Sequence, residues 1–285
     1  MSRTEDNNPN TVNLDKLSTQ EFVNVFLQED QAVWRALDKA KAEIATAIDL
    51  IYENFRGIED TIEPYDPHNP KPYLGPKIFY LGAGTSGRLG VLDAVECLPT
   101  FSAHPEMIQG IIAGGERALT RAVEGAEDDA EAGRKLIEEK LGARDILIGI
   151  SASGGAAYVV AALEAACRLG AKTIAISNNP DALIFKHCDQ KIFLDTGAEV
   201  LAGSTRLKAG TAQKITLNIL STGLMVKLGK VMGNLMIDVQ ATNIKLRKRS
   251  VELVKHLTNC SEEEAVRALQ SQKYKVKAAI QNYLR

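Results

Sequence analysis

The sequence lacks the features that mark several common classes of protein. Its four cysteines include no C-x-x-C pair and its four histidines show no ligand spacing, so no metal site or disulfide framework is predicted. A net charge of −2 offers no basic face to nucleic acid. No apolar run is long enough to span a bilayer, and residues 1–10 are polar and acidic rather than signal-like. We therefore expect a cytoplasmic protein without a metal, a nucleic-acid partner or a membrane span.

What the sequence does contain is typical of a globular α/β protein. It has 285 residues, 45% of them hydrophobic and 25% charged, which allows a substantial core. Aromatic residues are few, at 5%, whereas glycine is plentiful, with 22 residues. This balance suits alanine-rich helices packed over a parallel sheet with glycine-rich turns.

The first quarter of the chain reads as helix followed by an irregular segment. Ser18 and Glu21 form a capping-box pattern, and apolar residues then recur at helical spacing, which predicts helices over 19–29 and 30–55. Prolines crowd the next stretch, at positions 64, 67, 70, 72 and 76. They predict a partly extended surface excursion, for which a tolerated insertion is favoured over a partner-binding loop.

Short apolar runs then alternate with helical patterns. The expected strands are Lys77–Leu81, Met107–Ala113, Asp145–Ile150, Lys172–Ile176 and Lys191–Leu194. Helical patterns follow, notably over Ala156–Leu169 and Ala209–Leu228. Runs this apolar, separated by helices, indicate a parallel sheet covered on both faces.

The segment from Asn259 onward reads as a separate small helical unit. Ser261 and Glu264 form a second capping-box pattern, followed by apolar residues at helical spacing. Two or three short helices fit there, and they resemble a small ubiquitin-associated-type bundle. A role as an oligomerisation or lid element is favoured over ubiquitin binding.

The glycine-rich loop Gly82–Arg88 directly follows the first strand and opens a helix. Its pattern fits the dinucleotide-binding G-x-G-x-x-G, so a nicotinamide site must be weighed. That reading needs an acidic residue at the end of the second strand. The second strand instead ends in Ala113-Gly114-Gly115, and Glu116 comes too late.

Hydroxyl residues favour a sugar phosphate over a dinucleotide. Thr85 and Ser86 add hydroxyl donors to a helix N-terminus, which already attracts anions. The third strand ends in a second loop of this kind, Ser151–Gly155. Helix capping would explain one such loop, but explains both less readily. A P-loop is excluded because no Gly-Lys-Ser/Thr closes the first loop, and Arg88 breaks a nucleophile-elbow pattern.

Longer stretches carry a family resemblance. They are Leu81–Cys97, Gln109–Glu116, Ala122–Asp129, Glu199–Lys214 and Gly229–Asn243. With them the chain resembles the sugar isomerase (SIS) fold, and specifically the N-acetylmuramic acid 6-phosphate etherase family. The resemblance implies a five-stranded SIS-type parallel sheet, a homodimer, and an active site that the second copy can complete. The expected division is 1–56 N-terminal helical segment, 57–76 proline-rich insertion, 77–245 SIS sugar-phosphate-binding domain and 246–285 small helical domain.

The resemblance also implies a reaction and its residues. The family removes D-lactate from the C3 ether of its substrate and adds water, leaving N-acetylglucosamine 6-phosphate; no cofactor is implied. Glu96 would protonate the leaving lactate and Glu127 would act as base, with Glu124 as the rival of Glu127. The candidates for binding the sugar phosphate are Gly84, Thr85, Ser86, Gly87, Ser151, Ser153, Gly154, Ser204, Thr205 and Lys208.

The chain departs from the family pattern at functional loops. Gly155-Ala156-Ala157 stands where Arg-Thr-Pro is usual, Val95 replaces a Ser beside the acid, Leu98 replaces a Pro, and Asn8 stands at a typical Arg. Loss of the loop Arg removes a planar donor. Two alternatives to the etherase therefore stay open. One is a non-catalytic sugar-phosphate sensor resembling glucokinase regulatory protein, and the other is a sugar-phosphate isomerase.

Overall fold

A five-stranded parallel sheet forms the centre of the protein, seen in a computed structural model that describes residues 3–67, 69–238 and 244–283. The sheet order is β2-β1-β3-β4-β5. The strands are β1 (Ile78–Gly82), β2 (Ile108–Ile112), β3 (Ile146–Ile150), β4 (Lys172–Ser177) and β5 (Gln190–Phe193). Each lies within two residues of its predicted position, and the predicted α/β architecture with a five-stranded parallel sheet is confirmed.

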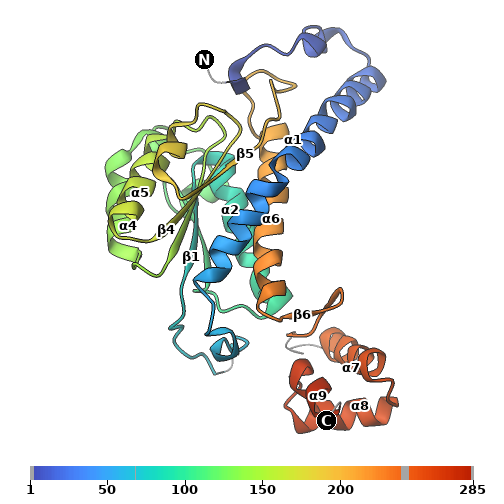
Figure 1. Ribbon diagram of the computed structural model, residues 1–285. Helices are drawn as coiled ribbons and strands as arrows, with labels where there is room; N and C mark the ends of the chain where they lie inside the picture. Colours follow the sequence, from blue (N-terminus) through green and yellow to red (C-terminus); the bar gives the residue numbers. More distant parts are fainter. Residues whose placement is uncertain (1–2, 68, 239–243, 284–285) are drawn as a thin grey trace.

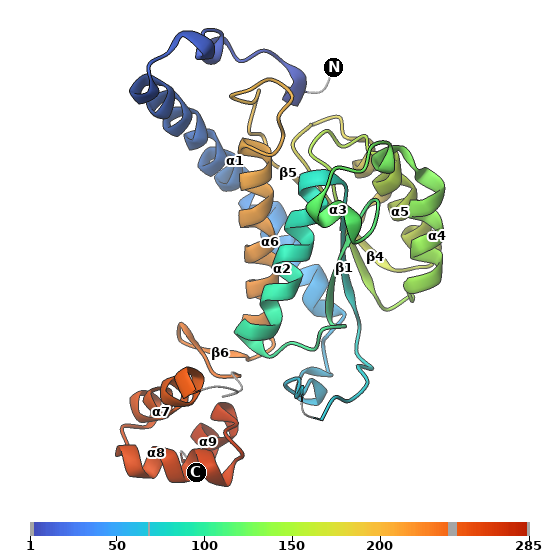
Figure 2. The same ribbon diagram turned by 180° about the vertical axis from the view of Figure 1, so that it is seen from behind.

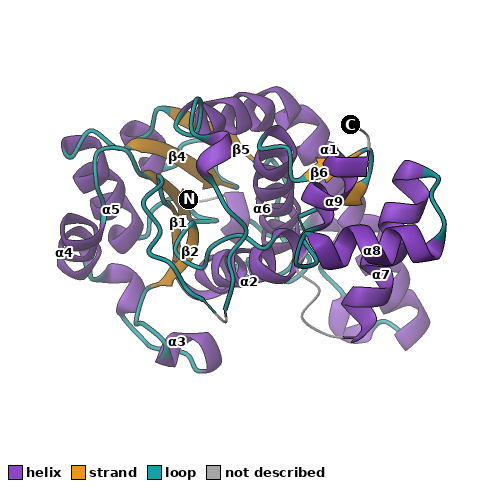
Figure 3. Ribbon diagram, turned by 90° about the horizontal axis from the view of Figure 1, so that it is seen from below, coloured by secondary structure: helices purple, strands orange, loops and turns teal. Residues whose placement is uncertain are grey.

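Helices cover both faces of this sheet, because its strands are apolar on both sides (Figure 3). Tyr80 and Ile148 point into one core beneath α1 (Thr19–Glu53), α2 (Gly84–Phe101) and α6 (Lys208–Lys227). Their neighbours Phe79 and Leu147 point into a second core against α4 (Ala130–Lys140) and α5 (Ala157–Arg168). Short elements join these layers: α3 (Arg117–Thr120), η5 (Ala126–Asp128) and η6 (Leu183–His187).

Helix α1 is a single helix of 35 residues, and the predicted break after residue 29 is wrong. It begins with the predicted capping box, in which the backbone N–H of Ser18 donates to Glu21 at 2.9 Å. No glycine or proline interrupts the helix, so nothing in its backbone requires a break. Its first turns project beyond the sheet (Figure 1). The chain before it forms three short turns: η1 (Arg3–Glu5), η2 (Pro9–Thr11) and η3 (Leu14–Lys16).

The described residues of the proline-rich segment are irregular, as predicted, apart from η4 (Glu59–Thr61). Contacts with His104 nevertheless hold this segment against the rest of the protein. The ring of Tyr73 stacks on His104 with centroids 5.3 Å apart, and Tyr65 meets it edge-on at 4.9 Å. The His104 Nε2 atom lies 2.9 Å from the carbonyl oxygen of Lys71.

The C-terminal region has its own core. A hairpin, β6 (Val231–Met232) and β7 (Leu235–Met236), leads from α6 into α7 (Ile244–Thr258), α8 (Glu262–Ser271) and α9 (Val276–Tyr283). The predicted capping box at Ser261 opens α8. Leu253, Val254, Leu269 and Ile280 are buried together with Ile237 of the preceding segment. This bundle lies at the C-terminal end of α6 (Figures 1 and 2).

Some of the sequence lies outside the described residues, namely 1–2, 68, 239–243 and 284–285. They include the end of the stretch Gly229–Asn243 and the last two positions of the predicted helical tail. Across the residues that the structure describes, no helix has the length and apolar character needed to cross a membrane.

Candidate functional site

A cavity of about 240 Å³ opens where β1 and β3 end. It is lined by Glu5, Ala83, Gly84, Thr85, Ser86, Glu127, Ile150, Ser151, Ala152, Ser153, Ala156, Gly203 and Thr205. The carboxyl edge of a parallel sheet is the usual ligand-binding edge of α/β folds. Four loops that are far apart in the sequence meet there, together with the N-terminal segment that carries Glu5.

The first loop places a helix N-terminus against the cavity. Helix α2 starts directly after β1, and the turn is so tight that a Cβ on Gly82 would lie 2.7 Å from the backbone N of Gly87. The N–H groups of the first turn have no partner within an α-helix, so those of Gly84, Thr85 and Ser86 are available to an anion.

The side chain of Ser86 is also committed to a buried network. Its hydroxyl donates to Gln213 of α6 at 2.9 Å, and Gln213 in turn donates to Asn178 at 3.0 Å. The hydroxyl hydrogen of Ser86 therefore points to the protein. Its backbone N–H, rather than its side chain, is the donor that remains for a ligand.

The second loop supplies free hydroxyl donors. The Ser151 Oγ atom accepts from the backbone N–H of Gly154 at 3.0 Å, so its own hydrogen is left for a ligand. Ser153 behaves in the same way with Gly155, at 3.4 Å. Both serines, which the sequence singled out, line the cavity.

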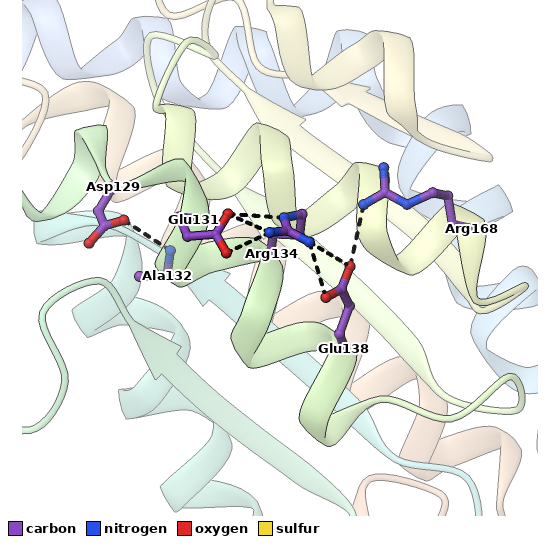
Figure 4. Close-up of polar contacts among 6 residues, drawn as sticks. All are labelled: Asp129, Glu131, Ala132, Arg134, Glu138 and Arg168. Carbon is purple, nitrogen blue, oxygen red and sulfur yellow. Dashed lines mark hydrogen bonds and ion pairs between the residues drawn. The ribbon is translucent and has the colours of Figure 1, made fainter.

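The third loop distinguishes Glu127 from its neighbours in the acidic run. Glu127 lines the cavity, whereas Glu124 does not. Capping of α4 falls to Asp129, whose Oδ1 accepts from the N–H of Ala132 at 2.9 Å (Figure 4). Further along α4, Arg134 joins Glu131 and Glu138, so these charges are paired on the surface. Glu127 is thus the carboxylate of this run that faces the cavity.

The fourth loop precedes α6 and brings Gly203 and Thr205 to the cavity. It abuts the first loop, because a Cβ on Gly210 would lie 3.3 Å from both the Thr205 carbonyl oxygen and Thr85 Cγ2. Ser204 is half-buried beside them, and it lies outside the lining residues.

Lys208 does not reach the cavity. It is buried, and its Nζ atom lies 2.8 Å from Oε2 of Glu29 in α1. Glu199, also buried, caps the same end of α6 by accepting from the N–H groups of Lys208 and Ala209. Burial raises the pKa of Glu199, and these two hydrogen bonds only partly offset the effect.

Two predicted glycines serve packing instead of lining the cavity. A Cβ on Gly87 would lie 2.6 Å from the carbonyl oxygen of Gly82. Gly154 has a φ of +75°, and a Cβ there would meet Ala182. Both positions need glycine for the loop to close.

Glu96 lies far from the cavity of its own chain. It is exposed on α2, twelve residues beyond Gly84, which corresponds to about 18 Å along a helix. One turn earlier, Asp93 is buried and accepts from Asn218 of α6 at 2.6 Å. Burial raises the pKa of Asp93 despite that bond. The structure therefore does not bring Glu96 and Glu127 together within one chain.

Sequence reasoning missed Glu5, which lines the cavity from the N-terminal segment. Among the departures from the family pattern, Ala156 is part of the lining and Gly155 borders open space. The charged side chains among the described lining residues are Glu5 and Glu127. Within the described chain, no group of three His, Cys, Asp or Glu side chains is placed to hold a metal ion.

Three known domain patterns match parts of this chain. The pattern of the glucokinase regulatory protein N-terminal SIS domain matches residues 69–167, that of the SIS domain matches 126–222, and that of the C-terminal lid domain of glucokinase regulatory protein matches 233–284. A solved protein of Escherichia coli CFT073 shares the fold with a TM-score of 0.51 and 15% identity. The match covers 76% of this chain and 97% of that protein.

Two curated relatives are much closer in sequence. N-acetylmuramic acid 6-phosphate etherase 2 of Lactiplantibacillus plantarum is 46% identical over 97% of this chain and 88% of its own length. The N-acetylmuramic acid 6-phosphate etherase of Gloeobacter violaceus is 49% identical over 97% of this chain and 85% of its own length. With this identity across nearly the whole sequence, the chain belongs to the N-acetylmuramic acid 6-phosphate etherase family.

Proposed function

We propose that this protein cleaves the D-lactyl ether of N-acetylmuramic acid 6-phosphate, giving N-acetylglucosamine 6-phosphate and D-lactate. The observation that carries the proposal is the cavity, which combines a helix N-terminus, two serine hydroxyls and the carboxylate of Glu127. The names of the relatives point to the same substrate. In this proposal residues 77–245 bind the sugar phosphate, and residues 246–285 act as a lid or oligomerisation element.

The phosphate occupies the donor-rich side of the cavity. In this proposal the N–H groups at the start of α2 and the hydroxyls of Ser151 and Ser153 donate hydrogen bonds to it. The Thr85 and Thr205 hydroxyls, which lie on adjoining loops, bind phosphate or sugar oxygens. The described lining residues include no lysine that could bind the phosphate, and Lys208 is instead paired with Glu29.

Two carboxyl groups are sufficient for the chemistry. In the open-chain sugar the C1 aldehyde acidifies the C2 proton, which Glu127 removes as base. The bond between C3 and the ether oxygen breaks as a C2–C3 double bond forms, and the departing lactate oxygen takes a proton from Glu96. Water then adds at C3 while a proton returns to C2, so that no oxidant or cofactor is consumed.

Glu96 reaches a cavity only if a second copy of the chain supplies it. It sits in an exposed apolar stripe of α2, between Leu92 (50% exposed) and Leu98, and next to Val95 (62% exposed). Helix α6, which packs beside α2, leaves Ile219 and Val226 exposed one heptad apart. Apolar stripes of this kind are typical of interfaces. We therefore propose a homodimer in which Glu96 of one copy faces Glu127 of the other.

Lactate release from N-acetylmuramic acid 6-phosphate tests the reaction. The wild type should release lactate, and Glu127→Gln should abolish release because an amide cannot accept the C2 proton. Glu124→Gln, from the same acidic run but outside the cavity, is the matched control and should behave as the wild type. Sugar-phosphate binding without lactate release by the wild type would favour a sensor, and aldose–ketose interconversion would favour an isomerase.

Mixing two inactive variants tests the shared site. Glu96→Gln and Glu127→Gln homodimers should each be inactive, whereas subunit exchange between them creates heterodimers with one intact site. Lactate release should therefore reappear on mixing. A mixture that exchanges subunits but stays inactive would show that both carboxylates must come from one chain.

A further inference from the structure

The N-terminal segment lies beside the cavity and is anchored there both before and after Glu5. The first anchor is formed by Arg3 and Thr4. The carbonyl oxygen of Thr4, which is buried, accepts from the backbone N–H of Gly203 at 3.1 Å. Arg3 forms an ion pair with Asp195 at 2.6 Å. These contacts place Glu5 beside the loop that lines the cavity.

A second anchor lies at Asn8. Its side chain is buried and donates to Glu29 at 2.6 Å, and Asn10 donates to the other carboxylate oxygen at 2.8 Å. Glu29 in turn binds Lys208 at the start of α6. We call residues 3–11 the N-terminal strap. Because the strap is anchored before and after Glu5, the backbone at that residue is held beside the cavity.

The carboxylate of Glu5 lies close to Gly203, on the side where a side chain would project. A Cβ on Gly203 would lie 2.8 Å from Oε2 of Glu5, and Gly203 has a φ of +75°. Glycine at this position therefore allows both the turn and the close approach of the carboxylate. Glu5 and Gly203 together form one wall of the cavity.

The chemistry of this wall differs from that of the donor-rich side of the cavity, which lies opposite in character to the carboxylates of Glu5 and Glu127. The first turn of α2 and the serines present N–H and O–H donors, which suit a phosphate. An ionised carboxylate offers only acceptors and repels a phosphate dianion. A ligand with a phosphate at one end and O–H or N–H donors at the other would satisfy both sides.

We infer that Glu5 is a specificity-determining residue, whose carboxylate accepts hydrogen bonds from the hydroxyl or acetamido donors of the sugar, away from its phosphate. This inference rests on the proposed function and extends it to the N-terminal strap. Glu5 then selects a sugar phosphate over a bare phosphate, because its carboxylate binds the donors and disfavours the anion.

Glu5→Ala, Glu5→Gln and the matched control Asp6→Asn test this role by lactate release. Glu5→Ala should raise KM by roughly ten- to a hundred-fold, the size expected for a lost hydrogen bond to a charged group, with kcat within about threefold of the wild type. Glu5→Gln keeps one acceptor oxygen and should fall between. Asp6 is an exposed neighbour outside the cavity lining, so Asp6→Asn should match the wild type. Unchanged KM in both Glu5 variants, or lost kcat at unchanged KM, would overturn the inference.

Binding by calorimetry separates this inference from the proposed reaction, since it needs no turnover. N-acetylglucosamine 6-phosphate and inorganic phosphate are titrated into the wild type and Glu5→Ala. The variant should bind the sugar phosphate roughly tenfold or more weakly, and should bind inorganic phosphate at least as well. Equal affinity for the sugar phosphate, or equal loss for both ligands, would contradict the role of Glu5 even in a protein that releases lactate. Failure of lactate release with the expected binding pattern would instead count against the reaction.

Discussion

The Nζ atom of Lys208 lies 2.8 Å from Oε2 of Glu29, with only 3% and 14% of the two side chains exposed. This ion pair joins the first residue of α6 to α1, and Asn8 and Asn10 bind the same carboxylate. It therefore connects the N-terminal strap to the loop that precedes α6. Lys208, which was predicted to bind phosphate, instead holds together segments that surround the cavity.

Breaking this pair from one side should be costly. Glu29→Leu leaves the Lys208 ammonium buried without its partner, and should lower the free energy of unfolding by about 3 kcal/mol. Lys208→Met should cost a similar amount. The double variant should cost clearly less than the sum, because two apolar side chains can pack where two charges were paired. Urea denaturation measures all three, and strictly additive losses would show that the two residues are not coupled.

The same carboxylate predicts a dependence of stability on pH. Burial alone would raise the pKa of Glu29, but hydrogen bonds from Lys208, Asn10 and Asn8 outweigh it and lower the pKa below 4.5. A lowered pKa in the folded state means that the ionised group stabilises the fold above pH 4.5, and that this stability is lost as the pH falls through the folded value. The stability difference between the wild type and Glu29→Gln should thus be constant near neutrality and shrink under acid conditions. A difference that grows on acidification would contradict this assignment.

The sequence predicted what is encoded locally. The strands could be predicted because they are unbroken apolar runs. The loops that join a strand to a helix could be predicted in the same way, and with them the positions of Thr85, Ser86, Ser151 and Ser153. Lys208 could not be placed, because its partner is 179 residues away in the chain. Glu5 was missed for the same reason, since only the folded chain brings it to Gly203. Glu96 was recognised by resemblance alone, and its distance from Glu127 emerges only in three dimensions.

The loop after β3 offers room for the arginine that the family pattern usually has. A Cβ on Gly155 meets no atom within 4 Å, and its φ is not positive. Gly155→Arg should therefore fold, and its guanidinium should strengthen phosphate binding and lower the inhibition constant of inorganic phosphate by about tenfold. Gly154→Ala, one residue earlier, should disrupt the loop, because Gly154 has a φ of +75° and a Cβ at this position would clash with Ala182. Unchanged phosphate inhibition in Gly155→Arg would show that the loop lies too far from the anion.

His104 should hold the proline-rich segment in place without affecting the cavity. Its ring stacks on Tyr73 and meets Tyr65, and these contacts hold the described residues of the proline-rich segment against the rest of the protein. His104→Ala should expose this segment to limited proteolysis while lactate release stays near the wild-type level. Protection equal to the wild type would indicate that the other contacts of the segment, such as the backbone bond from Tyr65 to Ser102, are sufficient.

Gly203→Ala should act on the substrate through Glu5. The new methyl group would lie 2.8 Å from the Glu5 carboxylate, and alanine at a φ of +75° costs about 1 kcal/mol, so the carboxylate must move while the fold survives. KM should rise roughly as in Glu5→Ala. Because both substitutions remove the same contact, the double variant should raise KM little beyond either single one. Multiplicative effects of the two substitutions would mean that Gly203 shapes the cavity by a route other than Glu5, and normal KM in Gly203→Ala would show that the carboxylate does not depend on this wall.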